Sequence, residues 1–452
     1  MQNLFWYLVG LIGFNVLPIV ASVALRYERA LISLDSIILL LLFAFRKRKL
    51  AWTFLAGLII SESLYGVRQQ YPLFNLHTLL DVLPFIRYAN PWVILAGCGV
   101  LIVFVGLCAF SGHVIARQYN RPALLGVLLL AGLSANVSAL TNFDSMRPGR
   151  VRVLNNAVYG STVYELYYKW RADGSEWGTV DDGRNFYPLK TLNTPFYIWP
   201  KGVQAKKVLF LMVESWGQAA NEKEFNLQTQ ALTQNNKLKV LKNGQIEYSG
   251  GTVAAELRDL CGISPISYRF SVIPEDYASN CLPRKLAEQG YSTVALHGAH
   301  AGMYSRNTWY PIAGFQKSYF LNSPLAEVSR CKSFPGFCDV DLIPHVIQEL
   351  RNNKQIFFYW MTLNSHAPYD EHDLKNTNNL ICPQIGLKEG ERCNQFRLIK
   401  EFFDTLGASI TKPGLTGTEI VLVGDHKPPF FTGNFDQDFV KGKVPYIHLK
   451  IR

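Results

Sequence analysis

Hydrophobic residues are unevenly distributed along this chain, and most of their excess lies before residue 141. A helix of about 20 apolar residues is long enough to cross a bilayer. The mean hydropathy of +0.07 over 452 residues is high for a soluble protein and agrees with membrane spans in this part. Two of the candidate segments are short, and Glu62 lies inside one of them. The sequence predicts five spans, Leu4–Leu25, Ala30–Phe45, Leu50–Tyr65, Trp92–Phe110 and Ala123–Leu140.

Positive charge predicts the orientation of these spans. The cluster Arg46–Lys49 should stay in the cytoplasm, and Arg117 and Arg121 mark a second cytoplasmic loop. With five spans the N-terminus is then inside, and everything after about residue 141 is outside. Arg26 and Arg29 fall on the outer side and count against this topology. The first span has too long an apolar core for a cleaved signal peptide, so we interpret it as an anchor.

The sequence divides into a transmembrane domain (1–140), a periplasmic connector (141–204) and a catalytic candidate (205–452). Between the third and fourth spans, Gln69–Asn90 is either an interfacial helix that lines a lipid entrance or an ordinary loop. In the connector, Val151–Trp170 predicts an amphipathic helix. Ala172–Pro200 is rich in Gly, Asp, Asn, Pro and aromatic residues, a composition typical of a linker.

From Lys206 onward, apolar runs typical of buried strands alternate with helical stretches such as Cys281–Gln289 and Val340–Arg351. This alternation predicts an α/β domain whose central sheet is mostly parallel, with helices on both faces. Ligands in such folds bind at the carboxyl ends of the strands. Each of the four runs is followed by polar residues. Glu214 follows Val208–Val213, and His297 follows Ser292–Leu296. Asn364 to His366 follow Gln355–Leu363, and Asp425 and His426 come just after Glu419–Val423.

Two carboxylates and an imidazole at neighbouring strand ends predict a site for one divalent cation. Glu214 and Asp425 offer oxygen and His426 offers nitrogen, a donor set that favours zinc and also suits manganese. A cation lowers the pKa of a nearby hydroxyl, which would make Thr252 a nucleophile. A helix-forming run follows Thr252, so its hydroxyl would face phosphate at a helix N-terminus. A simple helix N-cap is the alternative role for Thr252.

Three further residues are candidates for binding a substrate phosphate. His297 and Arg306 are nine residues apart, so one loop can fold both over a single anion, and arginine binds phosphate oxygens in a bidentate manner. His366 would donate to the leaving oxygen or bind the phosphate, and Tyr304 would wall the pocket. The alternative for each histidine is a satisfied loop residue.

Charge and cysteine content agree with an exported domain. The formal net charge of +11 favours anionic lipid head groups or a charged glycan, and no nucleic-acid motif is present. Cys98 and Cys108 lie in a predicted span. An even number of cysteines outside the membrane suggests disulfides, and a zinc cluster is the weaker alternative because no C-x-x-C pair occurs. Sequence proximity favours the pairs Cys261–Cys281, Cys331–Cys338 and Cys382–Cys393.

Taken together, the motifs resemble those of the alkaline phosphatase/sulfatase superfamily, over about residues 205–452. The nearest branch is that of the membrane-anchored lipoteichoic acid synthases and phosphoethanolamine transferases, which the five-span anchor also fits. The motifs are Val213-Glu-Ser-Trp-Gly217, Gly250-Gly-Thr-Val-Ala-Ala-Glu256, His297 with Arg306, Asn364-Ser-His366 and Gly424-Asp-His426.

The resemblance implies a metal site of Glu214, Thr252, Asp425 and His426, with Thr252 as the nucleophile. It also implies that His297, Arg306 and His366 bind the substrate phosphate, and Tyr304 falls where the lipoteichoic acid synthases carry Trp. Such an enzyme attacks a phospholipid in the outer leaflet of the bacterial inner membrane. It releases diacylglycerol and passes the head group from a phospho-threonine to an envelope glycan or glycolipid.

Departures from the family pattern leave the head group open between phosphoethanolamine and phosphoglycerol. The phosphoethanolamine branch usually continues its Asp-His with Gly-Glu-Ser, whereas Lys427-Pro-Pro-Phe430 follows here. The pair His297 and Arg306 is more like the glycerophosphate branch, but the disulfides are more like the phosphoethanolamine enzymes. A true sulfatase needs C/S-x-P-x-R, and Cys281-Leu-Pro-Arg-Lys285 ends in Lys and lies too far along the chain.

Two other functions compete with the head-group transferase. One is a membrane-anchored phosphodiesterase or phosphatase that uses water as the acceptor. The other is a non-catalytic scaffold that binds lipid or a glycan-export partner, which the intact Glu214, Asp425 and His426 disfavour.

Overall fold

The structure is a computed structural model of the whole chain. It describes residues 2–24, 29, 32–70, 91–117, 152–153, 156–157, 159–163, 166, 186–189, 193–265, 273–334, 336–375, 381–430, 432–433 and 435–452. The chain forms two compact units, Met1–Val180 and Asp181–Arg452. The division falls inside the predicted connector, residues 141–204.

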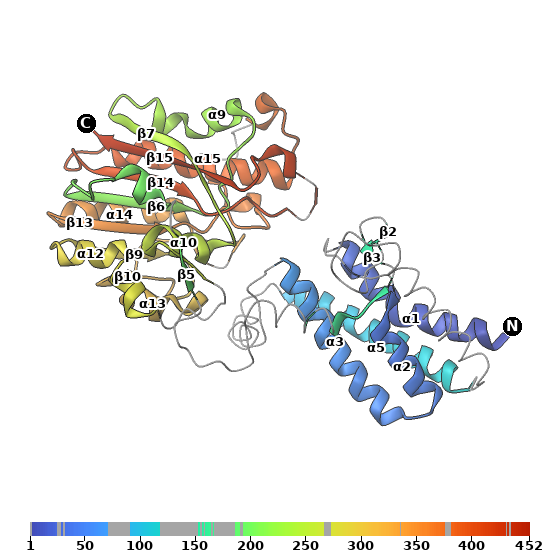
Figure 1. Cartoon of the computed structure of the whole chain (residues 1–452). Coiled ribbons are helices and arrows are strands. Elements are labelled where there is room, and N and C mark those ends of the chain that lie inside the picture. The colour runs from blue at the N-terminus through green and yellow to red at the C-terminus, as the bar shows by residue number, and fades with distance from the viewer. Residues whose placement is uncertain are drawn as a thin grey trace. The chain divides into compact units, whose positions relative to one another are not determined.

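The first unit is helical, with α1 (Gln2–Ala24), α2 (Leu34–Ala44), α3 (Arg48–Gln70) and α5 (Pro91–Arg117) (Figure 1). Aromatic and aliphatic side chains from these helices form its core, among them Phe14, Leu40, Phe43 and Phe104. Two glycines of α1 allow α5 to approach closely. A Cβ on Gly10 would lie 2.4 Å from Ile115 Cδ1, and one on Gly13 would lie 2.2 Å from Ser111 Oγ.

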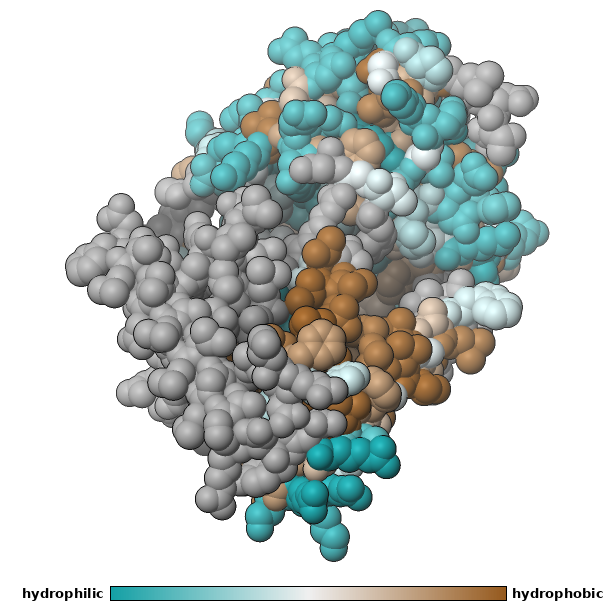
Figure 2. All heavy atoms as spheres, turned by 90° about the vertical axis from the view of Figure 1, so that its right-hand side faces the viewer, coloured by the Kyte–Doolittle hydropathy of each residue, from teal (hydrophilic) through white to brown (hydrophobic). Residues whose placement is uncertain are grey.

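Among the described residues, two helices are long and apolar enough to cross a membrane, Phe5–Val23 and Ile94–Arg117. Large apolar side chains stay exposed on both, including Ile12, Val20 and Ile102, and Figure 2 shows an apolar area on the surface of the chain. Of the other predicted spans, Ala123–Leu140 lies outside the described residues, as does most of the predicted interfacial segment Gln69–Asn90. The full set of five spans therefore stays a prediction.

Arg29, one of the two arginines that count against the predicted topology, pairs with Glu62, which lies inside the third predicted span. Arg29 Nε and Nη2 donate to the carboxylate of Glu62 at 3.0 and 2.8 Å, and both side chains are buried. Asn15 Oδ1 accepts from Arg29 Nη2, and Thr162 Oγ1 donates to Glu62. A charge among apolar helices is tolerated when it is paired in this way.

The amphipathic helix predicted over Val151–Trp170 is wrong in its first half. Arg152–Val153 (β2) and Asn156–Ala157 (β3) form an antiparallel pair, and Tyr159–Gly160 (β4) runs parallel to Ile32–Ser33 (β1). Two consecutive asparagines, at 155 and 156, favour a turn over a helix, and strand pairing with a segment far along the chain overrides a weak helical pattern.

The second unit is built on a seven-stranded mixed sheet with the order β10-β9-β13-β6-β14-β15-β7 (Figure 1). The five strands from β10 to β14 are parallel, and β15 and β7 extend the sheet by antiparallel pairing. All four predicted strands are present. The bounds are Lys207–Val213 (β6), Leu238–Glu247 (β7), Ser292–His297 (β9), Lys317–Tyr319 (β10), Ile356–Met361 (β13), Glu419–Gly424 (β14) and Lys443–Ile451 (β15).

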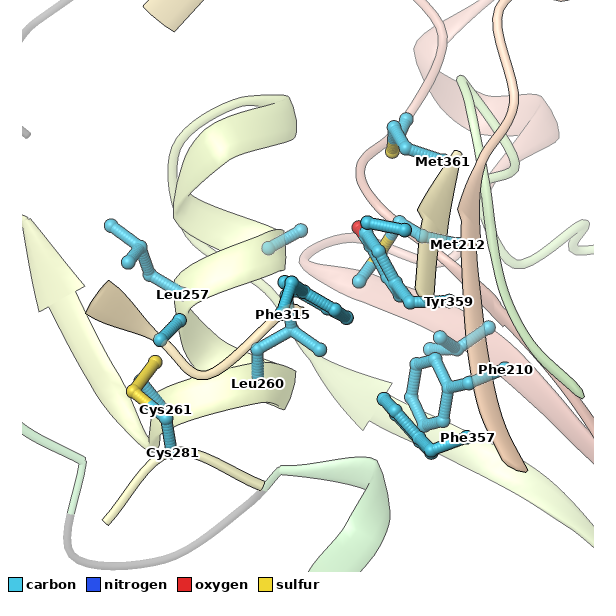
Figure 3. Packing of buried hydrophobic residues seen from close by; sticks show 14 of the residues in the cluster. Phe210, Met212, Leu257, Leu260, Cys261, Cys281, Phe315, Phe357, Tyr359 and Met361 are labelled. Carbon is cyan, nitrogen blue, oxygen red and sulfur yellow. A yellow bond between two sulfur atoms is a disulfide. The ribbon is translucent and has the colours of Figure 1, made fainter. Parts of the chain in front are cut away.

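Helices cover both faces of this sheet, so its parallel strands are buried on both sides. The cluster on one face includes Leu257, Leu260 and Phe315, which pack with Phe210 and Tyr359 (Figure 3). This face is covered by α10 (Thr252–Cys261), α12 (Leu282–Glu288) and α13 (Arg306–Ile312), and the other by α9 (Glu222–Thr233), α14 (Asp339–Asn352) and α15 (Glu391–Ile410). Shorter elements are β5 (Phe186–Pro188), α8 (Thr194–Ile198), β8 (Ile263–Pro265), α11 (Glu275–Ala278), β11 (Arg330–Cys331) and β12 (Gly336–Phe337).

The six cysteines of this unit form three disulfides, Cys261–Cys281, Cys331–Cys338 and Cys382–Cys393. These are the pairs that sequence proximity favours. The first joins the end of α10 to the start of α12, at the edge of the apolar cluster in Figure 3. The nucleophile candidate Thr252 is therefore at the start of a helix whose other end is covalently fixed.

We predict that Gly407→Ala destabilises the second unit. A Cβ there would lie 2.4 Å from the carbonyl oxygen of Ala231, where α15 crosses α9. Alanine gains about 1 kcal/mol of helix propensity, but a clash with backbone costs about 1–3 kcal/mol. The midpoint of thermal unfolding should therefore fall, whereas Ser409→Ala on the same helix should leave it unchanged. A rise in the midpoint for Gly407→Ala would contradict this packing.

Candidate active site

The register of two adjacent strands brings the acidic candidates together. β6 and β14 are parallel neighbours in which Val213 pairs with Gly424, so Glu214 and Asp425 leave the sheet at the same level. Gly424 is required here, because a Cβ would lie 1.9 Å from the carbonyl oxygen of Trp216. The shared strand end is thus a consequence of register and of close backbone packing.

Glu214, Asp425 and His426 form a compact cluster whose potential ligand atoms all lie within 4.8 Å of one another. His426 Nε2 is 3.2 Å from Asp425 Oδ2 and 3.5 Å from Glu214 Oε1. The other ring nitrogen, Nδ1, lies 2.9 Å from the carbonyl oxygen of Lys427. Donation by Nδ1 to that carbonyl leaves the lone pair of the neutral ring on Nε2, which faces the two carboxylates.

Thr252 completes this cluster. Its Oγ1 donates to Glu214 Oε2 at 3.1 Å and lies 3.4 Å from His426 Nε2. Thr252 is the first residue of α10, and the N-cap residue is Gly251, with no side-chain cap hydrogen bond. The hydroxyl therefore does not act as a helix cap, and it lies where the helix dipole and free backbone N–H groups favour an anion.

The electrostatics of the cluster indicate an excess of negative charge. Burial and the nearby Glu214 raise the pKa of Asp425 to about 8. Burial opposes ionisation of His426, but Asp425 and Glu214 outweigh it and raise the pKa of His426 to about 10. Burial also acts to raise the pKa of Glu214, yet His426, His366 and the Ser215 hydroxyl hold it below its ordinary range. Asp425 and His426 thus bind protons more strongly than the isolated side chains would.

A divalent cation fits this donor set. Asp425 Oδ2 is buried and has no hydrogen-bond partner among the described residues, although His426 Nε2 lies 3.2 Å from it. Asp425 Oδ1 is already fixed by the backbone N–H groups of Ser215 and His426, at 2.7 and 2.6 Å. A buried carboxylate oxygen without a donor is costly unless a cation occupies the space beside it.

His297 and His366 each present one ring nitrogen for a ligand. His297 Nδ1 lies 3.1 Å from the carbonyl oxygen of Met361, while its buried Nε2 has no partner among the described residues. Burial lowers the pKa of His297 well below its ordinary value, and the charge of Arg306 lowers it further. His366 Nδ1 lies 2.7 Å from the carbonyl oxygen of Ala367, and its ring packs 4.7 Å from Phe334.

Arg306 is less accessible than the sequence predicts. It is fully buried, and both Nε and Nη2 donate to Glu256 Oε2, at 2.9 and 2.7 Å. The bidentate edge predicted for phosphate is thus held by an internal carboxylate. Tyr304 lies 5.2 Å from the guanidinium, ring centroid to Cζ, and both Tyr304 and Ser305 have left-handed backbone angles.

Sequence reasoning missed Ser215, which contacts both acidic side chains. Its Oγ donates to Glu214 Oε1 at 2.9 Å, and its N–H donates to Asp425 Oδ1. Ser215 is buried and has a φ of 54°, an unusual angle for a residue other than glycine. The signal was its place directly after Glu214 at a strand end, where a short polar side chain can reach back to its neighbour.

Comparison with known protein families identifies the family to which this chain belongs. Residues 206–438, more than half of the chain, match the family described as Sulfatase. The chain belongs to the sulfatase family. This family is part of the metal-dependent alkaline phosphatase superfamily, as the motifs predict. In this member of the sulfatase family, Cys281 of the near-match to C/S-x-P-x-R is bound to Cys261 and is no free nucleophile.

Individual relatives are distant. A protein assigned to cyclic beta-1,2-glucan modification in Rhizobium meliloti (strain 1021) is 26% identical over 219 residues, which is 45% of this chain and 33% of the relative. The match thus spans about a third of that protein. A lipoteichoic acid synthase from Listeria monocytogenes is 18% identical, covering 54% of this chain and 64% of that one, with a TM-score of 0.37. A lipooligosaccharide phosphoethanolamine transferase from Neisseria meningitidis is 13% identical, covering 88% and 76%, with a TM-score of 0.41.

We predict that Ser215→Ala weakens metal binding by about 10–100-fold, the usual cost of removing a group that orients a ligand. Ser215→Gly relieves the left-handed backbone but also removes the hydroxyl, so it should weaken binding by a similar factor. Competition with a chromophoric chelator measures the dissociation constant of Zn²⁺ for each variant. Full affinity in Ser215→Gly would show that backbone geometry matters and the hydroxyl does not.

Proposed function

We propose that this member of the sulfatase family is a metal-dependent transferase that moves a phospholipid head group onto an envelope glycan or glycolipid. The observation that carries the proposal is the position of Thr252 Oγ1, 3.1 Å from Glu214 and 3.4 Å from His426 at the start of a helix. A hydroxyl that belongs to a buried cluster of potential ligands is suited to attack a phosphorus atom and to carry the phosphoryl group.

Glu214, Asp425 and His426 would hold one divalent cation, Zn²⁺ in preference to Mn²⁺ given the mixed nitrogen and oxygen donors. When bound, the cation would lower the pKa of the Thr252 hydroxyl and offset the charge of the phosphate. Ser215 keeps both carboxylates oriented, through its hydroxyl and its N–H.

The side chains account for each group that moves. Thr252 Oγ forms a bond to phosphorus while the bond from phosphorus to the diacylglycerol oxygen breaks, and the hydroxyl proton passes to solvent. His366, whose Nδ1 is engaged by the backbone, would donate a proton from Nε2 to the leaving oxygen. His297 Nε2 and Arg306 would bind the non-reacting phosphate oxygens, and Tyr304 would wall the pocket.

In a second step an acceptor hydroxyl attacks the phospho-threonine, and Thr252 leaves with a proton. The head group is phosphoethanolamine or phosphoglycerol. We place the chain in the bacterial cytoplasmic membrane, with several spans and the catalytic unit in the periplasm, because the apolar helices α1 and α5 precede that unit. Disulfides in the catalytic unit suit an oxidising compartment.

The direct test is intact-mass spectrometry of the full-length protein after incubation with vesicles of phosphatidylethanolamine or phosphatidylglycerol. One lipid should add the mass of its head group, and peptide mapping should place it on Thr252. Thr252→Ala should carry no added mass while its thermal unfolding is unchanged, and Thr252→Ser, which keeps a hydroxyl, should retain part of the modification. Labelling of Thr252→Ala to the wild-type extent would sink the proposed mechanism.

The choice between transfer and hydrolysis requires a second measurement. A transferase should release diacylglycerol much faster when an envelope glycan is present, since the glycan discharges the phospho-threonine. A phosphodiesterase should release it at the same rate with or without glycan, and free head-group phosphate should accumulate.

A further inference from the structure

The second unit contains a buried carboxylate that the proposed reaction does not use. Glu256 is fully buried and lies four residues after Thr252, one turn along α10. Its two oxygens accept four hydrogen bonds, from Arg306 Nε at 2.9 Å, Arg306 Nη2 at 2.7 Å, the Tyr310 hydroxyl at 2.5 Å and the Tyr359 hydroxyl at 3.1 Å. Burial and the charge of Glu256 raise the pKa of both tyrosines well above the ordinary value, so both remain neutral donors.

These contacts join three elements at the site. Glu256 belongs to the helix that starts with Thr252, Arg306 and Tyr310 belong to α13, and Tyr359 belongs to β13. The neighbouring residues Leu257 and Leu260 hold the same helix in the apolar cluster, where Tyr359 also packs (Figure 3). Glu256 is therefore the polar link between the nucleophile's helix and the segment that carries Arg306.

Arg306 is held on two sides. Glu256 takes the edge formed by Nε and Nη2, and the Tyr304 ring lies 5.2 Å from Cζ. The remaining nitrogen, Nη1, makes one long contact of 3.4 Å with the carbonyl oxygen of Met303. The charge of Arg306 also acts on His297, whose buried Nε2 has no partner among the described residues.

A purely structural role is a poor explanation of this ion pair. Apolar residues of similar volume often stabilise a core as well as a buried ion pair or better, because burial of two charges is costly. The backbone just before Arg306 is also strained, since Tyr304 and Ser305 both have φ near 52°. Strain of this kind persists where surrounding contacts hold a functional geometry.

We propose that Glu256 is a positioning residue that fixes Arg306 so that the Nη1 side of the guanidinium is directed to the substrate phosphate beside His297. The inference rests on the proposed function in that it needs a phosphate bound next to Thr252. Glu256 itself does not touch the phosphate, and it acts through Arg306.

The test is a double-mutant cycle in the metal-loaded, full-length protein with inorganic phosphate as the probe. In Glu256→Gln the amide oxygen still accepts from Arg306 and the amide N–H groups face the tyrosine oxygens, so the contacts persist without the charge. Isothermal titration calorimetry should show phosphate binding weakened on the order of tenfold in Glu256→Gln, the scale of a charge-assisted hydrogen bond. Arg306→Gln should weaken it at least as much, and the double variant should bind no more weakly than Arg306→Gln alone.

A matched control is available at the opposite end of the sheet. Glu419 is a buried carboxylate at the start of β14 that accepts from Trp199 Nε1 at 2.8 Å and contacts His448 Nε2 at 3.0 Å. Glu419→Gln should lower thermal stability without changing phosphate affinity. If Glu256→Gln does not fold, Tyr310→Phe removes one donor from Glu256 and should weaken phosphate binding by a smaller factor, which disappears in the Arg306→Gln background.

Three results overturn the proposal. The first is wild-type affinity for phosphate in Glu256→Gln, and the second is a double variant whose loss of affinity equals the product of the two single losses. The third is no phosphate binding by the wild-type protein. Failure of the proposed transferase gives a different pattern. In that case no phospholipid labels Thr252, but phosphate still binds and the cycle still decides whether Glu256 acts through Arg306.

Discussion

The site depends on a concentration of negative charge at the end of two adjacent strands. Parallel pairing of β6 with β14 forces Glu214 and Asp425 to leave the sheet side by side, in a place with little solvent. Two carboxylates this close are unfavourable without a positive partner. His426 supplies part of that charge, and a cation would supply the rest. In the proposed reaction, this excess of negative charge recruits the cation that would activate the Thr252 hydroxyl.

A second buried carboxylate in the same unit shows the opposite condition. Glu256 is as buried as Glu214, but both of its oxygens accept hydrogen bonds from an arginine and two tyrosine hydroxyls. Its negative charge is therefore already compensated without a metal ion. Asp425, in contrast, keeps one oxygen with no donor among the described residues. The balance of local donors and charges therefore distinguishes the candidate metal ligand from the proposed positioning residue, although both are buried carboxylates.

Sequence reasoning predicted the parts of the fold that local patterns encode. The four central strands are continuous apolar runs because both faces are covered, and the polar residues at their ends follow from strand direction. The edge strand β7, Leu238–Glu247, was missed because most of its residues are exposed and half of them are polar, so it has no continuous apolar run. The pairing of Glu256 with Arg306 was missed because 50 residues separate them, and no spacing rule connects such distant positions. The helix expected over Val151–Trp170 failed because β4 pairs with β1, a long-range contact.

Members of the sulfatase family share a fold with a candidate metal site, and the identity of the nucleophile bears on which chemical group such a site would transfer. A true sulfatase uses a cysteine or serine in the motif C/S-x-P-x-R. In this chain the nearest match to that motif begins at Cys281, which forms a disulfide with Cys261 at the end of α10. The hydroxyl beside the three candidate metal ligands is that of Thr252, at the far end of the same helix. The disulfide thus holds the helix that carries the proposed nucleophile, and it leaves Cys281 without a free thiol. A threonine oxygen at a helix N-terminus, 3.4 Å from the Nε2 of His426, is suited to react with a phosphate, because the helix N-terminus favours an anion.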